Sequence, residues 1–275
     1  MQLDHPGPLY ERSMLPVDQL GRIAESEASS YREAKPFPHS ILDNLFEEEI
    51  LDQVLREFPR ENDIAWKRFD DQRQVKLAST NENQIPPFIR HFLYELNSST
   101  FLRFLEVLTG IKGLISDPHF QGGGLHQIVP GGKLGAHTDF NKHPEFGLDR
   151  RLNVILYLNR DWREEYGGHF EMWDREVTHC VKGVLPIFNR MIIFDTNDFT
   201  FHGHPEPLRC PPGITRKSLA LYYFSNGRPA HEVSHAAGTD FIGRPNEGVT
   251  PKEFIKNLVP PIIWNARARL KRRRR

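Results

Sequence analysis

The sequence has little cysteine and no long apolar run, and each absence excludes a class of protein. Only two cysteines occur in 275 residues, Cys180 and Cys210, which is too few for a disulfide framework and gives no paired C-x-x-C metal site. No stretch is long and apolar enough to span a bilayer, and no apolar run near the start resembles a signal peptide. We therefore expect a cytoplasmic protein.

Net charge is also lacking, since 36 basic residues balance 36 acidic ones. Without an overall positive field we expect no nucleic-acid partner. The balance is uneven, because the last nine residues, RARLKRRRR at 267–275, carry seven of the positive charges. Such a run is by default a solvated tail. The apolar residues 262–264 in front of it also suit a weak contact with an anionic membrane surface, which attracts basic side chains.

Hydrophobic spacing predicts helices in the first part of the chain. Residues 1–34 are polar, and we expect them to form an arm or a peripheral helix. Residues 35–60 carry apolar side chains at helical spacing and predict one amphipathic helix, which Pro59 ends. Two shorter helices are expected at 85–97 and 98–110.

The pattern changes at about residue 113, where short apolar runs begin to alternate with Gly, Pro, Asn and Asp. These runs are GLHQIVP, RRLNVILYLN, GHFEMWD, RMIIFD and SLALYYFS. Helices followed by many short strands predict an α+β fold, a double-stranded β-helix (a jelly-roll or cupin-like barrel) with supporting N-terminal helices. We expect one domain over 35–229, with helices at 35–112 and the jelly-roll core at 113–229. Residues 230–275 would form a C-terminal extension that ends in the basic tail.

Candidate metal ligands lie in the segment PGGKLGAHTD. His137 and Asp139 are two residues apart, so an extended strand would point both side chains to the same face. The glycines before them suit a tight turn that leads into such a strand. The pair by itself is weak evidence, because His143-x-Glu145 repeats the pattern and a surface histidine–aspartate hydrogen bond would also explain it.

A third ligand can come from the later segment FHGHPE, which offers His202 and His204. An apolar strand, RMIIFD, precedes this segment, as an apolar strand follows the first pair. Two histidines and one carboxylate on one side of a metal, with the other positions open, are the arrangement of non-haem Fe(II) oxygenases.

An arginine follows at the start of another strand, TRKSLALYYF. Arg216 and Ser218 are two residues apart and would face the same side, where the planar guanidinium suits a carboxylate and the hydroxyl can add a hydrogen bond. Tyr157, in RRLNVILYLN, can offer a phenol from a neighbouring strand, although a core aromatic is the ordinary interpretation. The combination of H-x-D, a later histidine and R-x-S is much more specific than any one of its members.

With these residues the sequence resembles the iron(II)- and 2-oxoglutarate-dependent dioxygenase superfamily, in its prolyl 4-hydroxylase-like branch. The similarity extends from about residue 35 to residue 229. The positions that match the family motifs are His137, Asp139 and His202 for the metal, and Arg216, Ser218 and Tyr157 for 2-oxoglutarate. The gap between His202 and Arg216 is longer than the common family spacing, which leaves His204 open as the third ligand.

The resemblance implies an enzyme that binds Fe(II), uses 2-oxoglutarate and O2 as cosubstrates, and hydroxylates an unactivated C–H bond with release of succinate and CO2. Its substrate would be a small molecule or an amino-acid or peptidyl group, and no strand reads as a peptide-docking groove. Two alternatives stay open on the residues alone, a Zn-dependent hydrolase and a catalytically silent barrel that acts as a binding module. Arg216 with Ser218 argues against the hydrolase, which needs no clamp for a dicarboxylate.

Six residues near the mouth of the expected barrel are candidates for substrate contact. They are His126, Gln127, Phe140, Asn141, Arg150 and Trp173. Arg150, with its neighbour Arg151, would favour an anionic substrate. Each of the six has an ordinary structural or surface interpretation as well.

Overall fold

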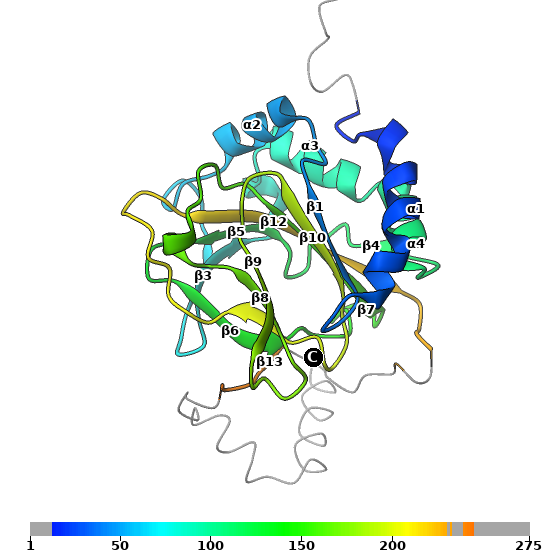
Figure 1. Cartoon of the computed structure of the whole chain (residues 1–275). Coiled ribbons are helices and arrows are strands. Elements are labelled where there is room, and N and C mark those ends of the chain that lie inside the picture. The colour runs from blue at the N-terminus through cyan, green and yellow to red at the C-terminus, as the bar shows by residue number, and fades with distance from the viewer. Residues whose placement is uncertain (1–12, 230–231, 233–238, 245–275) are drawn as a thin grey trace, which may run out of the picture. The chain divides into compact units, whose positions relative to one another are not determined.

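The computed structural model of this chain describes residues 13–229, 232 and 239–244. One compact unit reaches Ile242 (Figure 1), and the predicted basic tail at 267–275 lies outside the described residues. The helices are α1 (Val17–Glu33), α2 (Glu48–Glu57), α3 (Pro87–Leu96) and α4 (Ser99–Thr109), with 3-10 turns η2 (Glu82–Gln84) and η3 (Glu164–Tyr166). In the part of the chain described here, no helix is long and apolar enough to cross a membrane.

Thirteen strands form one sheet. They are β1 (His39–Asp43), β2 (Lys67–Asp70), β3 (Gln74–Ser79), β4 (Ile115–Ser116), β5 (Gly124–Ile128), β6 (Lys133–Thr138), β7 (Asp149–Tyr157), β8 (Phe170–Trp173), β9 (Cys180–Val184), β10 (Arg190–Asp195), β11 (His202–His204), β12 (Arg216–Ser225) and β13 (Asp240–Phe241). The order is β1-β10-β7-β12-β5-β3-β6-β11-β8-β9, with β2 and β4 paired to β3 and β12. The sheet curls on itself (Figure 1), which confirms the predicted jelly-roll fold with helices on its outside.

The helices form where the sequence supplies both an apolar face and end signals. Ser98 caps α4 by accepting a hydrogen bond from the Phe101 backbone N at 3.4 Å, and Gly110 ends the helix at φ +77°, a conformation that glycine adopts without strain. Phe101, the third residue after the cap, begins a face of buried side chains that packs into the core. Helix α1 packs against α4 and β1, so the N-terminal segment is part of the domain's outer layer.

The prediction of a single helix over 35–60 is wrong. Residues His39–Asp43 form strand β1, and only Glu48–Glu57 form a helix. Leu42, which fits the helical spacing, instead pairs with Met191 of β10 and buries its side chain in the sheet. Pairing with a buried central strand therefore overrides the local periodicity, as tertiary context commonly does.

Alternation along two central strands creates the interior of the barrel. On β7 and β12, one set of side chains packs toward the helices, namely Leu152, Val154, Leu156, Leu219, Leu221 and Tyr223. The alternate set lines an internal cavity, namely Asn153, Ile155, Tyr157, Arg216, Ser218, Ala220 and Tyr222. Because successive side chains of a strand point to opposite faces, one apolar stripe anchors the sheet while polar groups face inward.

Strand β13 belongs to the same sheet although it lies beyond residue 229, where the expected domain ends. Asp240 and Phe241 pair with Thr138 and His137 of β6, and the Phe241 ring lies 5.3 Å from the His137 ring, centroid to centroid. A segment assigned to the C-terminal extension therefore covers one side of a candidate metal ligand.

Candidate active site

Three side chains from two adjacent strands meet at the end of the barrel. His137 on β6 pairs directly with His202 on β11, so the two rings face one another with centroids 4.4 Å apart. Asp139 follows β6 by one residue, and one donor atom from each of the three lies within 4.8 Å of the others. All three residues are buried. The spacing suits a single metal ion bound on one side.

A glycine makes this close approach of strands feasible. A Cβ atom on Gly203, between His202 and His204, would lie only 2.7 Å from the backbone oxygens of both Leu134 and Gly135. Any other residue would therefore push β11 away from β6 and separate the two histidines.

The histidines are held with their Nε2 atoms toward the shared centre. His137 Nδ1 lies 2.9 Å from the Gly135 carbonyl oxygen and His202 Nδ1 lies 2.9 Å from the Thr200 carbonyl oxygen, so each Nδ1–H donates to the backbone. The Nε2 atoms lie 3.7 Å and 3.4 Å from the Asp139 carboxylate. Burial lowers the pKa of His137, and nearby His202 lowers it further. Neutral rings with an Nε2 lone pair are the form in which histidine binds metals.

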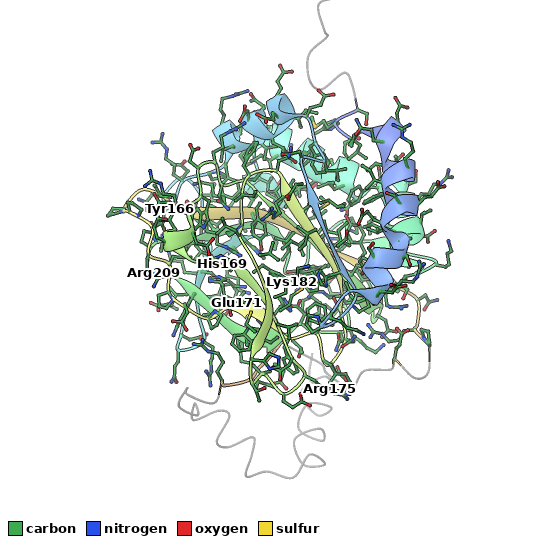
Figure 2. All side chains as sticks on the ribbon, viewed as in Figure 1. Tyr166, His169, Glu171, Arg175, Lys182 and Arg209 are labelled. Carbon is green, nitrogen blue, oxygen red and sulfur yellow. The ribbon has the colours of Figure 1, made fainter. Side chains whose placement is uncertain are left out.

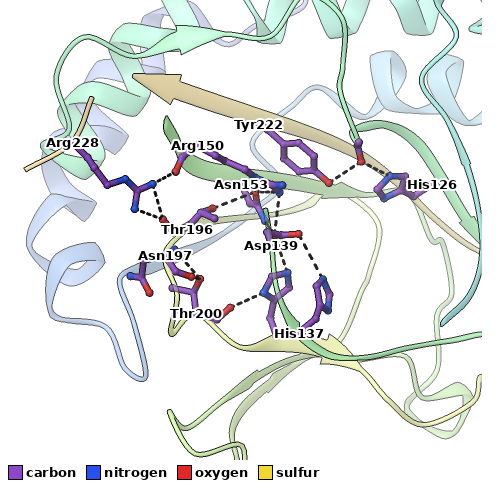
Figure 3. Close-up of polar contacts among 12 residues, drawn as sticks. His126, His137, Asp139, Arg150, Asn153, Thr196, Asn197, Thr200, Tyr222 and Arg228 are labelled. Atoms are coloured by element: carbon purple, nitrogen blue, oxygen red, sulfur yellow. Dashed lines mark hydrogen bonds and ion pairs between the residues drawn. The ribbon is translucent and has the colours of Figure 1, made fainter. Parts of the chain in front are cut away.

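Asp139 is held from behind by two side chains of β7. Its Oδ2 accepts hydrogen bonds from Arg150 Nη2 at 3.0 Å and from Asn153 Nδ2 at 2.6 Å (Figure 3). Burial alone would raise the pKa of Asp139, but the Arg150 guanidinium and His202 outweigh it and hold the pKa well below its usual range. The carboxylate is therefore ionised and fixed in orientation before any metal binds.

Arg150 is fully buried, so it lies behind the ligand rather than at the rim, where the sequence interpretation put it. Its guanidinium stacks 3.3 Å from the Tyr222 ring centroid and 4.5 Å from that of Phe140. It also donates to Asn153 Oδ1 (Figure 3). A bulge explains the placement, because Leu152 and Arg150 oppose the consecutive residues Tyr223 and Phe224. The extra residue turns Arg150 to the same side as Asn153.

A second polar group lies along the same barrel interior. Arg216 Nε donates to the Gly168 carbonyl at 2.8 Å, and Arg216 Nη2 donates to the Tyr157 hydroxyl at 3.0 Å. Ser218 pairs directly with Tyr157 across β12 and β7. Among the described residues no acidic side chain pairs with Arg216, although it is buried. A buried guanidinium without an acidic partner is suited to bind the carboxylate of a ligand.

Gly168 is required for the position of Arg216. Its φ is +70°, and an added Cβ would meet Leu208 Cδ2 at 2.5 Å and Arg216 Cδ at 3.1 Å. A side chain here would displace both the arginine and the carbonyl that holds it. The Gly-Gly pair before β8 was the available signal in the sequence.

Both polar groups line one cavity of about 70 Å³. Its remaining walls are apolar side chains such as Ile128, Ile155 and Phe170, with Lys76, His126 and His204 between them. Side chains fill the rest of the curled sheet (Figure 2). A ligand that spans the cavity could contact the metal ligands at one end and Arg216 at the other.

His204, the alternative third ligand, lines this cavity but is not part of the three-residue cluster. Both of its ring nitrogens lack a hydrogen-bond partner among the described residues, and burial holds its pKa well below the ordinary value. The geometry therefore favours His202 as the ligand.

Of the six candidates for substrate contact, only His126 lines the cavity. Its Nε2 lies 3.1 Å from the Gly122 carbonyl oxygen, and burial lowers its pKa to about 3. Gln127 points to the opposite face of β5, as alternation requires, and accepts from the Thr215 hydroxyl at 3.3 Å. Trp173 belongs to a separate apolar cluster with Ala136, Val177 and Phe201.

Phe140 and Asn141 directly follow the candidate metal ligand Asp139, and both contact other protein side chains around the site. The Phe140 ring lies edge-on to Tyr222 at 6.0 Å, and Asn141 Nδ2 donates to Asp198 at 2.6 Å. Neither lines the cavity. Sequence reasoning missed Asn153 and Lys76, which do line it.

Replacing Arg150 by methionine is expected to weaken metal binding about 10- to 100-fold, the usual effect of losing a partner that orients a metal ligand. The physical reason is that Asp139 loses a charged donor and becomes free to rotate. Competition between the protein and a metal chelator would measure the change. Arg151→Met is the matched control, since this neighbour pairs away from the site with Ser225 and Glu232. Equal metal affinity in both variants, with both folded, would contradict this role of Arg150.

The chain is similar to proteins of known class. Residues 123–224 match the sequence model described as the 2OG-Fe(II) oxygenase superfamily. A search of curated proteins gave no match.

Two solved structures share the fold. A prolyl 4-hydroxylase from Phytophthora capsici is 21% identical, with a TM-score of 0.52 over 80% of this chain and 69% of that one. A prolyl hydroxylase from Trichoplax adhaerens, solved with a peptide fragment of hypoxia inducible factor, is 15% identical, with a TM-score of 0.55 over 81% of this chain and 96% of that one. At these identities the structural likeness concerns the fold.

Proposed function

Because this chain is a 2-oxoglutarate dioxygenase with its 2OG-Fe(II) oxygenase domain at residues 123–224, we propose that it hydroxylates an unactivated C–H bond of a small-molecule or amino-acid-like substrate. One oxygen atom of O2 would enter the substrate as the hydroxyl group. The other would enter succinate, formed with CO2 from 2-oxoglutarate. The reaction balances without a further reductant, since oxidation of 2-oxoglutarate supplies two electrons.

The observation that carries the proposal is the presence of two complementary groups in one buried cavity. The cluster of His137, Asp139 and His202 offers two imidazole nitrogens and one carboxylate oxygen. Arg216 offers a buried cation along the same cavity. A dicarboxylate that also binds the metal satisfies both groups together, whereas either group alone would fit many ligands.

Each protein group has a separate task in this scheme. His137, Asp139 and His202 would hold Fe(II), and Arg216, Tyr157 and Ser218 would hold the far carboxylate of 2-oxoglutarate. When bound, Fe(II) and 2-oxoglutarate supply the activation of O2 on which the oxidation depends. The protein's own contribution is to fix these ligands in advance through backbone carbonyls, Arg150 and Asn153. The apolar walls at Ile128, Ile155 and Phe170 limit water around the reacting groups.

Two other functions explain these groups less well. A Zn-dependent hydrolase could use the three ligands and a bound water, but it gives no reason for a buried Arg216 facing the cavity. A silent binding barrel gives no reason for two histidines whose tautomers are fixed for metal binding.

The proposal is tested by anaerobic titration of the metal-free full chain with Fe(II) and then 2-oxoglutarate. We expect a visible metal-to-ligand charge-transfer band when both are present, because chelation through the keto acid requires two open metal positions. Subsequent exposure to O2 should release succinate. Folded protein that binds Fe(II) but gives neither a band nor succinate would overturn the proposal. Zn(II) in place of Fe(II) is the control and should give no band.

A further inference from the structure

Lys76 is a charged residue of the cavity to which the proposed function assigns no contact with Fe(II) or 2-oxoglutarate. It lies on β3, between β5 and β6, and lines the same cavity as Asp139 and Arg216. Across the β2–β3 hairpin it pairs with Phe69, whose ring centroid is 5.2 Å from Lys76 Nζ and 4.8 Å from Lys67 Nζ. Lys67 is exposed, so this hairpin carries one lysine in solvent and one in the cavity.

The charges around the cavity do not balance without another anion. No acidic side chain among the described residues forms an ion pair with Lys76, and burial lowers the pKa of Lys76 to about 8, so it is mostly protonated at neutral pH. Asp139 is already paired with Arg150. Arg216 would be paired with the far carboxylate of 2-oxoglutarate. Lys76 then remains as a cation of the cavity without an anionic partner, which is unfavourable without a further anion.

The order of the strands places Lys76 on the metal side of the cavity. Its strand, β3, pairs directly with β6, which carries His137, whereas β5 lies between β3 and β12, which carries Arg216. The lysine is therefore suited to a molecule that lies in the cavity beside the metal ligands.

We propose that Lys76 binds a carboxylate of the molecule that is oxidised, so that the substrate is a small carboxylic acid, such as an amino-acid-type molecule, hydroxylated near the end that Lys76 holds. This inference rests on the proposed function. The ammonium group gives the acid a directional ion pair, and exposed Lys67 on the same hairpin adds positive charge nearby.

The test compares the full chain with Lys76→Met, loaded anaerobically with Fe(II) and 2-oxoglutarate. The probes are L-amino acids and short aliphatic monocarboxylates, each paired with its uncharged amide. Binding next to the metal is read as a shift of the charge-transfer band, and turnover as succinate release after addition of O2. We expect some acids, and not their amides, to shift the band of the wild-type protein. In Lys76→Met the affinity for those acids should fall roughly 10- to 100-fold, as expected for loss of a charged hydrogen bond.

The affinity for 2-oxoglutarate shows whether Lys76 binds the carboxylate of the substrate or a carboxylate of 2-oxoglutarate. If Lys76 serves the substrate, the dissociation constant of 2-oxoglutarate changes less than about twofold in Lys76→Met. A tenfold or larger increase would assign Lys76 to the cosubstrate and overturn the inference. Acids that act no better than their amides would overturn it as well.

Arg68→Met is the matched control for the hairpin, because Arg68 is exposed and pairs with Glu61 at 2.9 Å. It should leave all three readouts unchanged. Absence of any charge-transfer band in the wild-type protein would instead be a failure of the proposed function.

Discussion

We expect the Asp139→Ala variant to lose Fe(II)-dependent succinate release altogether and to bind Fe(II) more than about 100-fold more weakly than the wild-type protein. Loss of an outer partner of a metal ligand already costs about 10- to 100-fold, and Asp139 is the only carboxylate of the three-residue cluster. The variant would also remove the acceptor of hydrogen bonds from Arg150 and Asn153, which leaves the buried Arg150 guanidinium without its carboxylate partner.

Glu145→Ala is a matched control for this experiment. Glu145 follows His143 at the same spacing that separates Asp139 from His137, but it is exposed and outside the metal cluster. We expect it to keep wild-type metal affinity and turnover. Chelator competition and a succinate assay would measure both variants, with circular dichroism as the check on folding. Full activity in Asp139→Ala would show that the metal ligands are different ones.

The same assays distinguish the two candidate histidines. His202→Ala should resemble Asp139→Ala, whereas His204→Ala should retain Fe(II) binding. The reason is that His202 Nε2 lies 3.4 Å from the Asp139 carboxylate, while His204 is not part of the three-residue cluster.

The fold and the grouping of the candidate ligands could be predicted because they depend on local periodicity. Two-residue spacing on a strand brings His137 and Asp139 to one side, and the same rule brings Arg216 and Ser218 into the cavity. The succession of helices and short strands was sufficient for the jelly roll. Where a strand begins inside a helix-like pattern, as at Leu42, periodicity failed because the pairing partner, Met191, lies far away in the sequence.

The supporting residues could not be predicted for a related reason. Arg150 faces the metal carboxylate only because a bulge opposite Tyr223 and Phe224 reverses the alternation of β7, and a bulge has no clear local signal in this sequence. Lys76 reaches the cavity because β3 lies between β5 and β6 in the sheet. This order of strands cannot be inferred from the local spacing of residues in the sequence. The sequence therefore predicts side chains that could bind a metal or a carboxylate, whereas the structure is needed to find the residues, such as Arg150, that fix those side chains in position.

The second large effect is expected at the other end of the cavity, where Arg216→Met should weaken binding of 2-oxoglutarate with little change in Fe(II) affinity. Removing one partner of a buried, hydrogen-bonded ion pair costs about 2–5 kcal/mol, which corresponds to a roughly 30- to several thousand-fold higher dissociation constant. The charge-transfer band would appear only at correspondingly higher 2-oxoglutarate concentrations. Tyr157→Phe removes one neutral hydroxyl near the same carboxylate and should cost about 1 kcal/mol, or roughly fivefold.

Arg209→Met is the control for loss of an arginine near the same strand. Arg209 is exposed on the loop before β12 (Figure 2), where its Nε donates to the Glu165 carbonyl at 3.3 Å. It should bind 2-oxoglutarate as the wild-type protein does. An unchanged dissociation constant in folded Arg216→Met would mean that the dicarboxylate does not reach this arginine. Lys76 would then be the remaining cation able to hold its far carboxylate, so Arg216→Met and Lys76→Met measured together determine which cation each ligand uses.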